Sequence, residues 1–290
     1  MRFNTILLLL ILMAASSSFL SVAQTSDEMT RKLWDTAFLT PAAKKSSASR
    51  RRRSGAYRVA TPNVPVDNVA PDTVVGVTIW RLRPANRTDT GERLIVHDDK
   101  ATTEWLPERI SATTKLVQGD KVRIAVEAAR DGFLYVVNRE QYADGSLGQT
   151  YLIFPTTRTA GGNNEVSIGK LVEIPDQDDA PPFFSMRKSR ADHVAEVLSV
   201  LVTPTPLPVE ITDKPVKLTE TQVAQWERSW GSSVGRLDMT TVGQTWTRDE
   251  KEARTRALTT TAPAPQLVFY RPGAKSTEPM FVKLKLSYRK

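Results

Sequence analysis

The sequence contains no cysteine and only two histidines, His97 and His193, among its 290 residues. The absence of cysteine excludes disulfides, thiolate metal ligands and lipid attachment at an N-terminal cysteine. Two histidines are too few for most zinc sites and for many acid–base arrangements. The fold must therefore be stabilised by a hydrophobic core, for which a hydrophobic content of 40% is sufficient.

A large charge excess is also missing from most of the chain. The formal net charge of the chain is +8. Residues 1–53 contain nine basic and three acidic side chains, a net charge of +6. The remaining residues contain 31 basic and 29 acidic side chains, a net charge of only +2. A surface that binds nucleic acid needs a concentrated positive charge. We therefore expect no nucleic-acid partner.

A secretory signal peptide is predicted over residues 1–23. Arg2 precedes an apolar run from Ile6 to Ala15, and small residues provide a cleavage site near Ala23. The run is shorter than the roughly 20 residues of a membrane-spanning helix, although a retained membrane anchor is the alternative. We expect an extracytoplasmic mature protein, periplasmic or secreted, with at most peripheral membrane association.

Residues 24–73 are predicted to form a disordered basic linker. Their Lys-, Ser- and Pro-rich composition buries too little apolar area to offset an ordering entropy of about 1–2 kcal/mol per residue. A run of four arginines is a candidate electrostatic tether to anionic envelope polymer or lipid: Arg50, Arg51, Arg52 and Arg53. A solvated spacer is the alternative reading of this run.

From residue 74 the pattern is that of a β protein. In 119–127, Val122, Ile124 and Val126 alternate with polar residues, which is typical of a half-buried strand. Residues 133–137 are apolar on both faces, which predicts a central strand between two layers. Asp-Gly pairs follow each of these segments, at 131–132 and 144–145, and predict tight turns with a positive glycine φ. These segments and 151–155 are therefore predicted to form an antiparallel meander. Further strands are predicted at 74–82, 93–97, 103–110, 165–174 and 195–202.

Two helices and two strands are predicted in the last third of the chain. Capping boxes begin helices at Thr219, with Trp226 on the apolar face, and at Thr247, with Ala253 and Ala257 facing inward. The strands 266–270 and 280–288 are expected to form a closing hairpin. The predicted fold is mainly β, an antiparallel β-sandwich over residues 74–290, with a core at 74–203, a small helical insertion at 215–260 near the C-terminus and the closing hairpin at 265–289.

Four blocks of this region occur in a fixed order: Gly119–Arg123, Arg130–Val136, Leu152–Pro155 and Glu173–Pro175. They resemble the bacterial family known as domain of unknown function 4384, with the resemblance covering about residues 74–202. It implies an exported β-sandwich-like module. Because that family has no established activity, the resemblance assigns no catalytic residue.

The strongest candidate for a metal site is a short acidic loop that contains Asp176, Asp178 and Asp179. Closely spaced carboxylates suit calcium. The loop lacks the glycine and the distal glutamate of an EF-hand, so a solvated acidic turn is the alternative. No cofactor site is predicted.

A hydrolytic set is a second, weaker candidate. Asp192 and His193 lie near Ser185 and Ser189 in the sequence, but the strand–Gly-x-Ser-x-Gly–helix context of a nucleophile elbow is missing. We therefore assign no catalytic residue.

Five tryptophans provide either core or a ligand platform: Trp80, Trp105, Trp226, Trp230 and Trp246. Helical spacing favours the core for Trp226. The edge of 165–174 is a further candidate for pairing with a partner strand.

The sequence as a whole favours an exported, non-catalytic binding or assembly module of the bacterial cell envelope. Its expected partner is another envelope protein or a polysaccharide. The alternatives are a hydrolase that uses carboxylates and a tether that acts through the arginine run.

Overall fold

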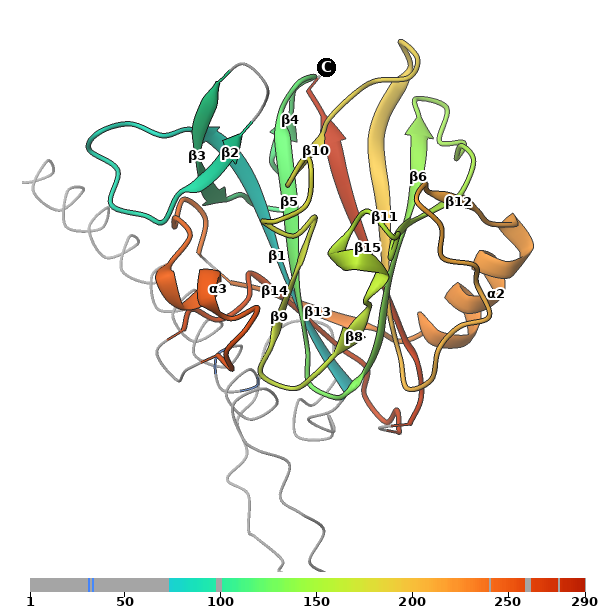
Figure 1. The fold of residues 1–290 in the computed structure, drawn as a ribbon. Helices are drawn as coiled ribbons and strands as arrows, with labels where there is room; N and C mark the ends of the chain where they lie inside the picture. The colour runs from blue at the N-terminus through green and yellow to red at the C-terminus, as the bar shows by residue number, and fades with distance from the viewer. Residues whose placement is uncertain are drawn as a thin grey trace, which may run out of the picture.

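Two β-sheets face each other in the structure, a computed structural model (Figure 1). It describes Arg31, Leu33 and residues 73–97, 101–239, 241–258, 262–275 and 277–289. Sheet A has eight strands: β1 (Val74–Pro84), β2 (Leu94–His97), β3 (Thr102–Arg109), β5 (Lys121–Ala128), β9 (Leu171–Ile174), β10 (Phe184–Ser185), β13 (Gly235–Asp238) and β14 (Leu267–Tyr270). Sheet B has seven: β4 (Lys115–Leu116), β6 (Gly132–Tyr142), β7 (Tyr151–Phe154), β8 (Glu165–Val166), β11 (His193–Thr203), β12 (Val216–Lys217) and β15 (Met280–Tyr288). The helices are α2 (Glu220–Trp230), α3 (Arg248–Glu252) and the short 3-10 helix η4 (Ala160–Gly162).

The main hydrophobic core lies between the two sheets. Val122, Ile124 and Val126 of β5 belong to one buried cluster with Leu134 and Val136 of β6. Burial of each such side chain stabilises the fold by about 1.5–3 kcal/mol. The predicted mainly β, antiparallel β-sandwich is confirmed.

Each sheet is also covered on its outer face. On sheet B, Trp226 of α2 packs in a cluster with Tyr135 and Val137 of β6. On sheet A, the segment 239–258, which contains α3, places Trp246 in a cluster with Trp80. Both faces of β6 are covered, which explains why its residues are apolar on both sides, as predicted. The predicted core position of Trp226 is also confirmed.

The expected signal peptide (1–23) and nearly all of the expected linker (24–73) lie outside the described residues. Leu33 is one exception, since its side chain is 7% exposed and joins the cluster on the outer face of sheet A. At this position the segment therefore contacts the sandwich. Within the described part of the chain, no helix is long and apolar enough to cross a membrane.

The predicted meander is wrong in its first step. β5 lies in sheet A, whereas β6 and β7 pair with each other in sheet B, so the chain crosses between sheets after Ala128. Arg130 holds this crossing, because its guanidinium donates hydrogen bonds to the carbonyl oxygens of Glu278 (2.5 Å) and Val202 (2.8 Å). Alternation of residues cannot distinguish such a crossing from a hairpin.

The two Asp-Gly turns also differ from each other. Gly145 has a φ of +86°, as predicted. Gly132 is not among the residues with positive φ, so that prediction is wrong. Glycine is needed there for space, because a Cβ would lie 2.4 Å from the carbonyl oxygen of Thr203.

The predicted closing hairpin is wrong as well. β14 lies in sheet A between β1 and β13, whereas β15 lies in sheet B between β11 and β4. Residues 165–174 are likewise divided, because β8 pairs with β6 and β9 with β5. The alternation along β15 is confirmed, with Leu284 and Leu286 buried and Lys283 and Lys285 exposed.

Both predicted helices begin at their capping residues, although at Thr219 only the bond from the Gln222 backbone N to the threonine side chain forms. Thr247 and Glu250 form the full capping box. However, α3 ends at Glu252, so Ala253 is buried as predicted but Ala257 is exposed. Beyond α3 the chain continues across sheet A without helical structure, and Leu258 is again buried against it.

A layer of buried charges lies between sheet A and the segment that covers it. Arg109 pairs with Glu250 at 2.5 Å and Arg123 pairs with Glu173 at 2.9 Å, and all four side chains are at most 5% exposed. Glu127 is also buried, and burial raises its pKa well above the ordinary value. Burial raises the pKa of Glu173 to about 7, despite the opposing effect of Arg123.

This layer predicts a decline in stability as pH rises. With a pKa near 7 instead of the ordinary 4.5, folded Glu173 keeps a proton that the unfolded chain loses between these values. The contribution of Glu173 to the free energy of unfolding should be complete below about pH 4.5 and lost by about pH 7, a change of up to ~3 kcal/mol. Glu173→Gln, which resembles the protonated carboxyl, should remove the part of this decline that Glu173 contributes in urea unfolding between about pH 5 and pH 8, while the buried Glu127 continues to contribute.

The matched control is Glu165→Gln on β8, whose side chain is exposed. Its stability should follow the pH dependence of the unmodified protein. Parallel curves for the unmodified protein and Glu173→Gln would contradict the assignment.

A second prediction concerns Gly132. Gly132→Ala should lower the free energy of unfolding by at least ~2 kcal/mol, since the backbone oxygen of Thr203 cannot move without displacing β11. In Gly148→Ala, the nearest atom to the new Cβ is the hydroxyl of Tyr142, which is the end of a flexible side chain, so the loss should be smaller. Urea unfolding of both variants at neutral pH measures the difference, and equal losses would be evidence against the close-approach argument.

Candidate binding cleft

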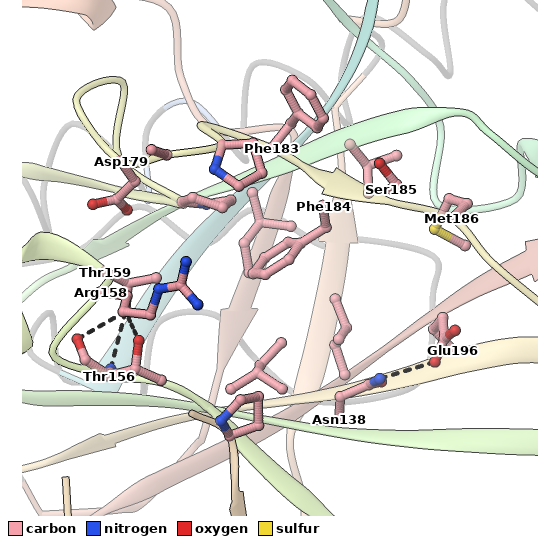
Figure 2. A pocket seen from close by; sticks show the side chains of 18 of the residues that line it. Asn138, Thr156, Arg158, Thr159, Asp179, Phe183, Phe184, Ser185, Met186 and Glu196 are labelled. Atoms are coloured by element: carbon pink, nitrogen blue, oxygen red, sulfur yellow. Dashed lines mark hydrogen bonds between the residues drawn. The ribbon is translucent and has the colours of Figure 1, made fainter. Parts of the chain in front are cut away.

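A cleft of about 400 Å³ opens between the two sheets beside β10 (Figure 2). Both sheets contribute to its apolar walls: Val122, Ile124, Ile153, Phe183, Phe184, Met186, Leu198 and Leu286. Loops that include Thr156–Thr159, Pro175, Asp179–Pro181 and Asp213 form the rim. A mostly apolar concave site with a few polar groups is the usual form of a ligand pocket.

Polar side chains replace the core residues at the floor of the cleft. Along β6 the inward residues are Leu134, Val136 and then Asn138. On the paired β11, which runs in the opposite direction, Glu196 precedes the inward Leu198 by two residues. A polar group on the inner face of a sandwich is costly unless it is hydrogen-bonded. The two side chains meet this requirement in part, because Asn138 Nδ2 donates to Glu196 Oε2 at 2.9 Å (Figure 2), whereas the buried Asn138 Oδ1 has no hydrogen-bond partner among the described residues.

The carboxyl of Glu196 is held in place and is still accessible. The Tyr288 hydroxyl lies 3.2 Å from Glu196 Oε1 and 2.8 Å from the carbonyl oxygen of Arg187, so its one hydrogen is shared between these acceptors, and His193 Nε2 lies 3.4 Å from the same Glu196 oxygen. Burial raises the pKa of Glu196, while the hydrogen bond from Asn138 opposes this shift. The side chain is 14% exposed, and a carboxylate has about four acceptor positions. Glu196 can therefore accept a further hydrogen bond from a bound group.

The turn that carries Arg158 forms part of the rim. Thr156 N donates to Thr159 Oγ1 at 2.9 Å, and Thr159 N donates to the Thr156 carbonyl at 3.0 Å. Arg158 is exposed, and no described carboxylate forms an ion pair with it. Figure 2 shows its guanidinium between the turn at Thr156 and the side chain of Phe184.

β10 brings an unpaired strand edge to the cleft. Within the described chain, β10 pairs only with β5. Backbone hydrogen bonds link Met186 to Asp120 and Gly119, on the β5 side. Because these bonds alternate along an antiparallel strand, the N–H and C=O of Ser185 face away from β5.

The edge suggested at 165–174 is less open than that of β10. The carbonyl oxygen of Ala253 accepts a hydrogen bond from Leu171 N, and the carbonyl oxygen of Gly169 accepts one from Leu258 N. The segment after α3 thus covers this part of sheet A.

The predicted metal ligands bind protein groups in the structure. Arg254 forms ion pairs with Asp176, at 3.0 Å, and with Asp178. Asp179 accepts backbone hydrogen bonds from Ala160 and Asp176. In the described ranges, no three His, Asp or Glu side chains are placed to hold a metal ion. The loop instead forms the part of the rim that carries Asp179.

The candidate hydrolytic residues are close in space but are not arranged for catalysis. His193 is fully buried, and its Nδ1 accepts a hydrogen bond from the backbone N of Ser189 at 3.3 Å. The Ser189 hydroxyl donates to Glu140 at 2.6 Å, and Asp192 pairs with Arg190 at 2.7 Å. Ser185 lies on β10 at the cleft. Among the described residues, no serine hydroxyl is thus hydrogen-bonded to the imidazole of His193.

The tryptophans divide between core and partly exposed positions. Trp80 and Trp246 are 1% exposed. Trp105 is half-buried, and the ammonium of Lys121 lies 4.5 Å from the centre of its ring. Trp230 stacks on Trp226 with ring centroids 5.8 Å apart. None of the five presents an uncovered face as part of the cleft.

The cleft residues that sequence reasoning missed are Asn138, Glu196 and Arg158. For Asn138 and Glu196 a signal exists, namely a polar residue at an inward position of an otherwise apolar strand. For Arg158 there is none, because only the folded turn shows that it lies at the rim. The candidate tether, Arg50 to Arg53, lies outside the described residues and stays a prediction.

No family model, curated protein or solved structure matches this chain in the comparisons. The resemblance to domain of unknown function 4384 therefore rests on the sequence blocks alone. Three of these blocks supply cleft residues in the structure, namely Val122, Ile153 and Pro175.

Proposed function

We propose that this protein is an exported, non-catalytic binding module of the bacterial cell envelope that holds an extended segment of a partner protein in the cleft. The observation that carries the proposal is the position of an unpaired strand edge, β10, beside an apolar cleft of about 400 Å³. The signal-peptide pattern of residues 1–23 supports export.

An extended polypeptide suits both features at once. A peptide strand that pairs with the free edge of Ser185 would gain backbone hydrogen bonds and would direct alternate side chains into the cleft. Phe184 and Leu198 provide apolar contact for such a side chain. Volumes of about 300–1,000 Å³ are usual for ligand sites, and this cleft lies at the low end of that range.

A polysaccharide partner is less well supported. Sugar rings stack on open aromatic faces, but the half-buried Trp105 is covered by Lys121 and packs near Phe183, with ring centroids 6.4 Å apart. A serine hydrolase is also less well supported, because Ser189, His193 and Asp192 bind other groups.

The proposal predicts that backbone pairing at β10 is required for binding. Peptides selected from a random display library on the mature chain, from Gln24, should bind at least tenfold more weakly to Ser185→Pro, which removes the outward N–H. Ser185→Ala keeps that N–H and is the matched control, with unchanged affinity expected. Fluorescence polarisation of a labelled peptide measures both.

Phe184→Ala tests the cleft independently of the backbone. Loss of this half-buried ring should cost about 1.5–3 kcal/mol of binding energy, or roughly tenfold to a hundredfold in affinity. Circular dichroism and urea unfolding confirm that each variant is folded. The proposal fails if no peptide is selected, or if the selected peptides bind folded Ser185→Pro and Phe184→Ala as tightly as the unmodified protein.

A further inference from the structure

The charges that line the cleft are unbalanced. Among its lining residues, Asp179, Glu196 and Asp213 carry carboxyl groups, whereas Arg158 is the one cation. The carboxyl groups also differ in position, because Asp179 and Asp213 lie in rim loops and Glu196 lies on β11 between the sheets. A ligand that complements this arrangement carries positive charge, with its charged end at the floor.

The floor is shaped to receive a donor at Glu196. Asn138 donates a hydrogen bond to Oε2 of this carboxyl and orients it, while Tyr288 and His193 lie against Oε1. An acceptor position remains on Oε2, on a side chain that lines the cleft. Because folding has already removed most of the water around Glu196, a bound cation adds little further desolvation at this carboxyl, which is the main cost of a buried ion pair.

The path to the floor is apolar. Ile153, Phe184 and Leu198 line the cleft together with Glu196, and Figure 2 shows Phe184 between Arg158 at the rim and Glu196. Lysine and arginine have a long aliphatic stem and a charged head, and they bury the stem along apolar surface while the head reaches a polar partner. A shorter side chain, on a peptide strand paired with β10, would leave the floor of the cleft unfilled.

We propose that the cleft selects a lysine or arginine side chain of the partner segment, with its cationic head bound to Glu196 and its stem packed on Phe184 and Leu198. This inference rests on the proposed function, since it assumes that a peptide occupies the cleft. In this arrangement Glu196 is the specificity-determining residue, and Asn138 positions it.

The experiment begins with the peptides selected on the unmodified mature chain. They should contain lysine or arginine at one fixed position. Replacement of that residue by norleucine or citrulline, which keep the length and remove the charge, should weaken binding at least tenfold. Glu196→Gln, which keeps an acceptor for Asn138, should weaken binding of the cationic peptide to a similar extent and should abolish its advantage over the neutral peptide.

Glu165→Gln, an exposed carboxyl on β8, is the control and should retain the full preference. A pH series adds a second measurement, because cation binding favours the ionised form of Glu196. Affinity for the cationic peptide should rise between about pH 5 and pH 8 in the unmodified protein and less in Glu196→Gln. The other titratable groups near this carboxyl, His193, Glu140 and Tyr288, are the same in both proteins.

The two proposals fail in different ways. If peptides bind and depend on Ser185 but show no fixed cation, or if Glu196→Gln keeps the preference for the cationic peptide, the inference on specificity is wrong and the binding module stands. If no peptide binds, the proposed function itself is wrong.

Discussion

The contact between the inner faces of the two sheets is the constraint on which the rest of this structure depends. Val122 and Ile124 on sheet A meet the core of sheet B through side chains that alternate with period two along each strand. Wherever the inward residues are apolar, the sheets close on each other. At Asn138 and Glu196 the inward residues become polar, and the cleft lies there. The cleft thus lies where the apolar core between the sheets ends.

Coverage of the outer faces fixes the remaining geometry. α2 covers sheet B, and the segment around α3 covers sheet A with a layer of paired charges above Trp80 and Trp246. Arg109 and Arg123 each lie near an indole ring as well as near a carboxylate, so each guanidinium combines a cation–π contact with an ion pair. These contacts leave a concave, partly apolar surface on the cleft side of the sandwich.

Strand positions and the sandwich were predictable because alternation and turn residues are local signals. The pairing of strands was not, since Arg130 and Gly132 act through contacts with residues some 70 to 150 positions away. The same is true of β14 and β15, whose separation into two sheets leaves the alternation of Leu284 and Leu286 unchanged. The cleft itself was partly foreseeable from Asn138 and Glu196, whereas Arg158 and the edge of β10 depend on loops that no periodic pattern describes.

The position of β14 and β15 has a consequence for the order in which this chain can acquire its structure. Each lies in the interior of a sheet, β14 between β1 and β13 and β15 between β11 and β4. Both sheets therefore lack a middle strand until residues 267–288 are present, and an emerging polypeptide cannot complete its sandwich from the N-terminal side. Closure of the two sheets therefore waits for residues 267–288, which supply one inner strand to each sheet.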